Sequence, residues 1–450
     1  MSGDRLMARA LRAAAAILLG HGGSQALRLA SNLILTRLLF PEAFGIMAIV
    51  SVVTVGLAMF SDVGVGPSIS QSKRGDEQVF LDTAWTIQVI RGLLLCGITG
   101  ILALPVANFY GEPALAMYLP VAGLSLAIAG FNPTRIETAH RHLLLGRVTS
   151  LDLLSQVIGV TFMVVLAYLM QSVWALVLGG LVAPLAKLVL TSVFLPGKAN
   201  RFKWERPAAQ ELMHFGKWIF LSTACYFMTS QGDKAILGRF LTLEILGIYN
   251  IGFFLANFPA GIGHVLVNRL LIPLYREKPP TESRENFDRI GRMRLVMTVS
   301  IMSAMLVMAY SGPWIVGLLY DPRYTMSGAI IVGVALGLLP HVIGMSYDQS
   351  ALAAGDSRTF FIYTSCRAFL GIAFILIGVT TYGLVGALIG MGASHIVSHP
   401  VLIWLARRHG AHDMRHDLIA SCVALVAGAG AVWLHWDALM LLPTEVVRGF

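Results

Sequence analysis

Charged side chains interrupt the apolar stretches of this 450-residue chain at only a few positions. A charge at the centre of a bilayer costs at least about 2.5–3.5 kcal/mol, so such residues are candidates for function. The cations outnumber the acids, and surplus positive charge in a partly wet cavity attracts an anionic cargo. A structural or interfacial role is an equal alternative for Arg91 and Lys187. The candidate cations are Arg28, Arg91, Lys187, Lys234 and Arg367, and the candidate acids are Asp233 and Asp348.

Polar residues also interrupt the first apolar run of each half of the chain, at the same depth. Lipid does not tolerate such a helix unless the polar face borders a cavity or other protein. The sequence therefore predicts that these two helices line a central, hydrated cavity. The predicted cavity residues are Gln25, Arg28 and Asn32 in the first half, and Gln231, Asp233 and Lys234 in the second.

Membrane-spanning helices must position these residues. The chain is 56% hydrophobic and 13% charged with a mean hydropathy of +0.73, and soluble proteins carry about twice that charged fraction. The apolar runs have the length of membrane helices and lack strand alternation, which favours an all-α integral membrane protein over a barrel. We expect about thirteen spans, at residues 10–36, 43–68, 79–106, 113–134, 148–169, 173–195, 212–238, 244–270, 290–311, 326–353, 359–380, 382–406 and 417–436.

Basic residues alternate between the connections of these spans. The N-terminal segment and every second connection are rich in lysine and arginine, and the richest is 269–294, which we assign to a cytoplasmic loop. The positive-inside rule then predicts a cytoplasmic N-terminus. This distribution accounts for most of the net charge of +9, so nucleic-acid binding is not needed to explain it.

A repeated motif indicates that the chain consists of two similar halves. Residues 34–46 and 236–248 share an arginine, a glutamate and a glycine at matching positions, after the first apolar run of each half. Internal duplication is the usual construction of secondary transporters, and six spans per half predict a parallel repeat. The predicted domains are a six-helix bundle at 1–196, a basic cytoplasmic linker at 197–211, a second six-helix bundle at 212–406 and an extra helical region at 407–450.

Patterns for metal or enzymatic chemistry are weak. His395 and His399 have the spacing of two ligands on one helix face but lack the glutamate of an H-E-x-x-H site. His409, His412 and His416 lie among loop arginines, whose charge would repel a metal ion. The four cysteines stand singly inside spans, and neither a P-loop nor a G-x-S-x-G motif is present. We therefore predict a non-enzyme with no metal and no bound cofactor.

Several short motifs follow one another along the chain, at residues 37–45, 60–66, 105–113, 174–177, 215–216, 233–239 and 246–250. Their order resembles that of Wzx-type oligosaccharide flippases, members of the multidrug/oligosaccharidyl-lipid/polysaccharide exporter superfamily. The similarity extends over about residues 10–400 and implies two six-helix bundles facing each other in a V shape, often with two further C-terminal helices.

This resemblance implies a cargo of undecaprenyl-diphosphate-linked sugar repeat units. Such a protein moves them from the cytoplasmic to the periplasmic leaflet of the bacterial inner membrane, for exopolysaccharide, capsule or O-antigen synthesis. A cationic cavity suits this cargo because the diphosphate is anionic and arginine matches phosphate oxygens. We expect Arg28 and Lys234 to contact the diphosphate, and Arg91 and Arg367 to line the path of the sugars.

The remaining expectations concern coupling and partners. Asp233 and Asp348 are expected to pair with cations or to couple transport to H⁺ or Na⁺. The expected partners are the lipid-linked glycan and membrane lipids, and a polysaccharide polymerase and a chain-length regulator are candidates. An ion-coupled multidrug exporter of the same superfamily is the alternative transporter, although the excess of deep cations disfavours cationic drugs. A membrane glycan polymerase or ligase is the alternative enzyme, and no outer connection exceeds about 15–20 residues, which is short for such a protein.

Overall fold

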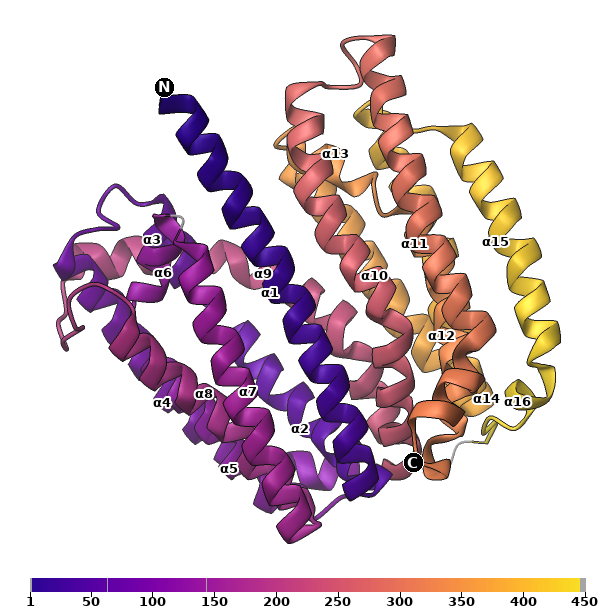
Figure 1. Ribbon diagram of the computed structural model, residues 1–450, viewed down its shortest axis with the longest axis horizontal. Coiled ribbons are helices and arrows are strands. Elements are labelled where there is room, and N and C mark those ends of the chain that lie inside the picture. Colours follow the sequence, from indigo (N-terminus) through magenta and orange to yellow (C-terminus); the bar gives the residue numbers. More distant parts are fainter. Residues whose placement is uncertain (1, 63, 143, 446–450) are drawn as a thin grey trace. The chain divides into compact units, whose positions relative to one another are not determined.

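The computed structural model describes residues 2–62, 64–142 and 144–445, and over these residues the protein is a multi-pass, all-helical membrane protein (Figure 1). The chain divides into two compact units, unit 1 at Met1–Ala224 and unit 2 at Cys225–Phe450. The division falls inside one long helix, α9. The predicted domain boundaries at 196, 211 and 406 stay predictions.

Unit 1 is built mainly from long helices, and the extended segment 195–205 joins α8 to α9. The two short helices, α3 and α6, pack against each other. Its helices are α1 (Ser2–Leu38), α2 (Pro41–Phe60), α3 (Val65–Gln71), α4 (Gln78–Tyr110), α5 (Leu115–Gly130), α6 (Arg135–Arg141), α7 (Leu145–Met170), α8 (Val173–Phe194) and the first part of α9 (Arg206–Phe240).

Unit 2 continues from α9 with a second set of long helices, among which α12 is the most buried candidate span. Its elements are α10 (Leu243–Glu277), α11 (Arg284–Leu319), the 3₁₀ turn η1 (Pro322–Tyr324), α12 (Met326–Gly344), α13 (Asp348–Ala353), α14 (Ser357–Arg408), α15 (Met414–Leu434) and α16 (Trp436–Met440).

The repeated motif forms the same local structure in both halves. In each copy a long helix ends, two residues form a turn and the next helix begins, at Leu38–Pro41 and at Phe240–Leu243. The shared arginine lies in the last turn of the first helix and the shared glutamate in the first turn of the second. Each charge therefore has the sign that the helix dipole favours. Proline at the start of α2 and the Thr242 side chain at the start of α10 complete the two caps.

The count of candidate spans differs from the predicted thirteen for identifiable reasons. Among the described residues nine helical segments are long and apolar enough to cross a membrane, or ten if the bent pair α5–α6 is one span. The polar helices α1 and α9 are not among them. The helix α14 is counted once but contains two predicted spans, 359–380 and 382–406, which are separated by a break at Tyr382–Gly383.

The basic segment 269–294, predicted as one loop, is mostly helical. Because proline cannot continue a helix, α10 ends at Glu277, just before Pro279, and α11 begins at Arg284. Arg294 therefore lies inside α11, where its side chain is only 1% exposed. Arg294 belongs both to this basic segment and to the predicted span 290–311; its position in a helix agrees with the span, and its assignment to a cytoplasmic loop is wrong. His416 was likewise placed in a loop, and it lies in the first turn of α15, where it is buried.

Small residues allow the helices of unit 1 to approach closely. Gly92 in α4 faces α5, where an added Cβ would lie 2.8 Å from the carbonyl oxygen of Leu126. Membrane helices pack through such contacts because lipid supplies no hydrophobic drive between them. Large apolar side chains such as Ile101 and Leu104 instead lie exposed on the outer face of α4.

Substituting Gly92 by leucine is expected to separate α4 from α5 and to lower the yield of folded protein several-fold. Over-packing costs about 1–3 kcal/mol even where neighbouring side chains can move, and here the opposing atoms are backbone. The measurement is the monodisperse fraction after detergent extraction. Gly97→Leu on the same helix is the control, because nothing lies within 4 Å of an added Cβ there. Equal yields for both variants would contradict this packing.

Candidate functional site

Unit 2 has a partly open cavity of about 410 Å³, which both polar and apolar side chains line. The helices α9, α10, α12 and α14 contribute its walls. The lining includes hydroxyl, amide, imidazole, guanidinium and aromatic side chains, among them Tyr226, Thr229, Ser230, Asp233, Phe253, Asn257, His264, His341, Arg367, Ser394 and His395.

Arg367 is the cation of this cavity. Its guanidinium Nη1 lies 3.5 Å from Nδ1 of His341, and its Cζ lies 5.7 Å from the ring centroid of Tyr363. No carboxylate among the described residues lies within ion-pair distance of it. The side chain of Arg367 is half-buried, and partial burial of a charge is less costly when an opposite charge pairs with it. The geometry therefore leaves Arg367 able to bind an anionic group.

Two stacked imidazoles lie beside this guanidinium. The rings of His341 and His395 are 5.1 Å apart between centroids and nearly parallel, at 22°. His264 on α10 also lines the cavity. A neutral imidazole offers one donor and one acceptor, so each ring can bind a hydroxyl group in either sense.

The two predicted acids of unit 2 are both buried and hydrogen-bonded. Asp233 is 8% exposed, lines the cavity and accepts a hydrogen bond of 2.8 Å from the hydroxyl of Tyr249. Asp348 is 7% exposed and accepts a hydrogen bond of 2.9 Å from Nε2 of Gln349. Neutral donors thus hold both carboxylates in place.

The other predicted residues of unit 2 lie near the same cavity. Lys234 is half-buried, with its Nζ 5.9 Å from the ring centroid of the cavity residue Phe253. Gln231 is on the same turn of α9, and its Oε1 is buried without a hydrogen-bond partner among the described residues. The structure thus brings Gln231, Asp233, Lys234 and Arg367 to one part of unit 2.

The predicted cations of unit 1 have local partners. Arg91 donates from Nε to Oγ of Ser61 at 2.9 Å and lies 3.7 Å from the carboxylate of Asp62. Lys187 forms a 2.8 Å ion pair with Asp152. These pairs fit the structural alternative that the sequence left open for both residues.

The polar face of α1 packs partly on α7. Ser24 on α1 donates a hydrogen bond of 2.6 Å to Gln156 on α7, which fixes the register of the two helices. Gln25 and Asn32 are half-buried, whereas Arg28 is exposed within unit 1. Their predicted role in a cavity between the two bundles stays a prediction.

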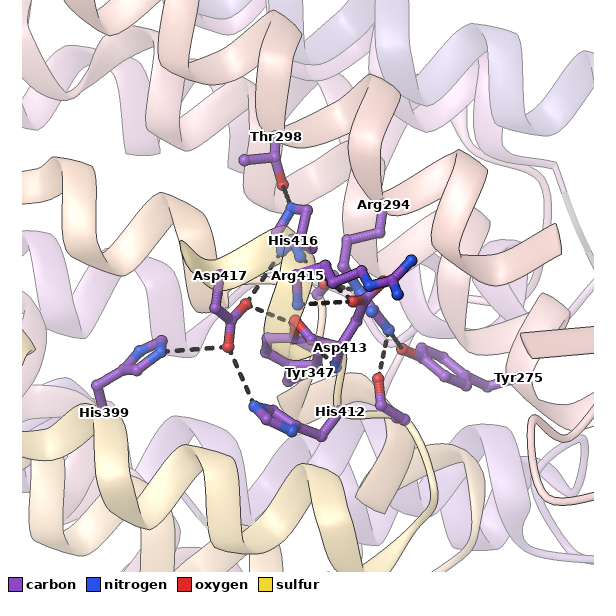
Figure 2. Close-up of polar contacts among 12 residues, drawn as sticks. Tyr275, Arg294, Thr298, Tyr347, His399, His412, Asp413, Arg415, His416 and Asp417 are labelled. Atoms are coloured by element: carbon purple, nitrogen blue, oxygen red, sulfur yellow. Dashed lines mark hydrogen bonds and ion pairs between the residues drawn. The ribbon is translucent and has the colours of Figure 1, made fainter. Parts of the chain in front are cut away.

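A second polar cluster joins α15 to the rest of unit 2, and we call it the Asp417 cluster. Its centre is the carboxylate of Asp417, which accepts a hydrogen bond of 2.6 Å from the Tyr347 hydroxyl and lies 3.0 Å from His416 Nδ1. Figure 2 shows the histidines pointing at this carboxylate from separate parts of the chain. The cluster consists of Arg294, Tyr347, His399, His412, His416 and Asp417.

Arg294 stabilises the other side of this cluster. Its guanidinium lies 4.3 Å from the Tyr347 ring centroid and donates to the backbone oxygen of Ala411 at 2.7 Å (Figure 2). The guanidinium of Arg294 therefore contacts the ring of Tyr347, and the carboxylate of Asp417 contacts its hydroxyl. Burial lowers the pKa of His412, which lies in the segment before α15, and the nearby Asp417 opposes this shift. The cluster lies where α15 packs against α11 and α12, and its His399–Asp417 contact joins α15 to α14.

Neither cluster could be assembled from the sequence. His264, His341 and His395 are far apart in the chain, and only the packing of three helices brings them to one cavity. The i, i+4 pair His395 and His399 is divided, since His395 lines the cavity whereas His399 lies 3.6 Å from Asp417. Among the described residues no group of three or more His, Cys, Asp or Glu side chains has the geometry to hold a metal ion.

Comparison with known proteins identifies a family and several relatives of this chain. The profile of the family described as "Polysaccharide biosynthesis protein" matches residues 34–328. The chain is 20% identical over 58% of its length to the teichuronic acid biosynthesis protein TuaB of Bacillus subtilis, and the match spans 56% of TuaB. It is 21% identical over 81% of its length to the lipopolysaccharide biosynthesis protein WzxC of Escherichia coli, spanning 74% of WzxC.

Solved structures show the same fold. The lipid II flippase MurJ, in an inward closed conformation, superposes with a TM-score of 0.70 at 13% identity, over 95% of this chain and 93% of MurJ. An inward-facing multidrug transporter of the MATE family and the MOP superfamily superposes with a TM-score of 0.61 at 15% identity, over 86% of this chain and 95% of that one. The expected exporter fold is confirmed. This chain belongs to the polysaccharide biosynthesis protein family and has the fold of the MOP-superfamily transporters.

Proposed function

We propose that this protein is a flippase for undecaprenyl-diphosphate-linked oligosaccharides. It moves these repeat units from the cytoplasmic to the periplasmic leaflet of the bacterial inner membrane, for surface polysaccharide synthesis. The observation that carries the proposal is the cavity of unit 2, where the guanidinium of Arg367 lies among hydroxyl, amide and imidazole groups and the carboxylate of Asp233. Such a cavity shelters an anionic and strongly hydrated cargo from lipid.

The family and the relatives support the same class of cargo. WzxC and TuaB are named for the synthesis of surface polymers, and MurJ is named a lipid II flippase. In our proposal the two units rock against each other, so that the polar cargo crosses while its polyprenyl tail stays in lipid. Arg28 and Lys234 contact the diphosphate, whereas Arg367 and Arg91 line the path of the sugars. The N-terminus lies in the cytoplasm.

Coupling and partners are further parts of the proposal. Asp233 and Asp348 are the candidates for H⁺ or Na⁺ coupling, because they are buried carboxylates inside membrane helices. The transported units pass to a polysaccharide polymerase and a chain-length regulator. The protein itself performs no catalysis, and no cofactor takes part.

A multidrug exporter is the second candidate, and the superposition on a MATE transporter favours it. Drug export and glycan transport give different phenotypes. We therefore propose deleting the gene and measuring both surface polysaccharide and susceptibility to cationic drugs, before and after complementation. Our proposal expects polymer to disappear and drug susceptibility to stay unchanged. The reverse pattern would assign the protein to drug export.

The predicted diphosphate contacts can be tested in the same strain. Alanine at Arg28 or at Lys234 is expected to abolish surface polymer at unchanged protein level, because an arginine or lysine contact to phosphate is a charge-assisted hydrogen bond. Arg358, which is exposed in the first turn of α14, is the control position for loss of a positive charge. Normal polymer in both the Arg28 and Lys234 variants would remove these residues from the path.

A further inference from the structure

We infer that the cavity of unit 2 is a subsite for one sugar residue that carries a single acid group. This inference rests on the proposed function, because it names the part of the glycan that unit 2 recognises. At about 410 Å³ the cavity lies near the lower end of the range for small-molecule sites, about 300–1,000 Å³. A single sugar residue fits a cavity of this size.

The anionic group is assigned by Arg367. This guanidinium has no carboxylate partner among the described residues in ion-pair range, and His341 is its neighbour at 3.5 Å. A guanidinium binds a carboxylate through two parallel N–H···O bonds, which a ring-borne carboxylate can accept. A cation at the middle of a membrane helix is far better tolerated when an anion occupies this position.

The other residues that line the cavity indicate what the uncharged part of the ligand is. Neutral imidazoles, Ser230 and Asn257 can each both donate and accept hydrogen bonds, as sugar hydroxyls do. The aromatic side chains of Phe253 and Tyr226 add apolar surface of the kind that faces the C–H side of a pyranose ring. A fully apolar ligand would leave the hydrogen-bonding side chains without a partner, and a purely anionic ligand would leave the aromatic side chains without one.

The charge balance favours one acid group over a diphosphate. Among the described lining residues Arg367 is the one arginine or lysine, and Asp233 places a carboxylate in the same wall. A diphosphate carries several negative charges, so that Asp233 would repel it while a single guanidinium left it incompletely neutralised. A single acid group pairs with Arg367 and leaves less uncompensated negative charge beside Asp233 than a diphosphate does, and a hydroxyl of the same sugar can donate a hydrogen bond to Asp233.

The test uses the purified full-length protein in lipid nanodiscs and three soluble probes. The probes are methyl β-D-glucuronide, methyl β-D-glucoside and inorganic pyrophosphate, and their affinities are measured by saturation-transfer NMR and by competition. The inference expects the glucuronide to bind at least about tenfold more tightly than the glucoside, since a charge-assisted hydrogen bond contributes about that factor. Arg367→Gln should remove this preference, whereas Arg358→Gln should retain it.

One further variant and a folding control separate a loss of ligand contacts from a folding defect. Asn257→Ala should weaken the binding of the glucuronide and of the glucoside by a similar factor. It removes an amide that can bind a sugar hydroxyl and leaves the guanidinium of Arg367 unchanged. Each variant is accepted only when its elution profile and thermal midpoint match those of the parent protein.

Three outcomes would overturn the inference. Equal affinity for the glucuronide and the glucoside would show that the cavity does not recognise an acid group. Pyrophosphate that binds more tightly than the glucuronide and displaces it would reassign the cavity to the lipid diphosphate, which leaves the proposed flippase function standing. No binding by any probe would remove the subsite, and the deletion phenotype would then decide separately whether the protein transports glycans.

Discussion

Replacing Arg367 by alanine is expected to reduce surface polymer at least about tenfold while the protein remains in the membrane at its normal level. The reason is that this guanidinium lines the cavity and has no acid in ion-pair range among the described residues, so that an anionic ligand can pair with it. A hydrogen bond to a charged group contributes about 1.5–3 kcal/mol, and every 1.4 kcal/mol is a tenfold change in binding.

The measurement is surface polymer per cell, quantified in the deletion strain that carries each variant at matched expression. Arg358→Ala, at the first turn of α14, is the matched control, because that side chain is exposed and does not line the cavity. Loss of polymer in both variants would indicate a general defect of α14. Normal polymer in Arg367→Ala would show that the cavity cation has no part in transport.

The second large effect concerns the Asp417 cluster. Asp417→Ala is expected to destabilise unit 2 by about 3 kcal/mol or more, because breaking a buried charge network leaves its other members unpaired. Tyr347→Phe should cost less, since it removes the hydroxyl and retains the ring that faces Arg294. The double variant should cost less than the sum of the two, by about 1–3 kcal/mol of coupling.

Thermal unfolding of the detergent-solubilised variants, followed by loss of monodisperse protein, measures this coupling. Asp437→Ala is the control, because its side chain is exposed on α16. Additive effects of Asp417→Ala and Tyr347→Phe would mean that the 2.6 Å contact between them contributes nothing specific. The cluster would then be an incidental meeting of polar groups at the start of α15.

Patterns that repeat within a short segment allowed much of the fold to be predicted. The copies at 34–46 and 236–248 predicted a duplicated element, and each forms a helix end, a two-residue turn and a helix start. The charges that recur there have a local cause in the helix dipole, so the sequence alone could reveal them. The break at Tyr382–Gly383 likewise fits the predicted division between two spans, because Gly383 has a positive φ of 53° that glycine adopts without strain.

The polar clusters depend on contacts between distant segments and could not be predicted in the same way. His395 and His399 lie one turn apart on α14, yet one faces the cavity and the other faces Asp417. The sequence assigns Arg294 to a loop because it follows a run of basic residues. Its burial follows from the packing of α11 against α15 and the 409–413 segment, which the sequence does not show. Local spacing identified these residue types, whereas the tertiary packing selected their partners.

The central claim is that this chain carries lipid-linked glycans across the membrane, and the most direct measurement is their exposure at the outer leaflet. In spheroplasts of a deletion strain, the fraction of lipid-linked oligosaccharide that a membrane-impermeant oxidant modifies is compared with the fraction after complementation. Our account predicts that this fraction is near zero in the deletion strain and rises at least about tenfold when the intact protein is restored. An equal exposed fraction with and without the protein would contradict the account.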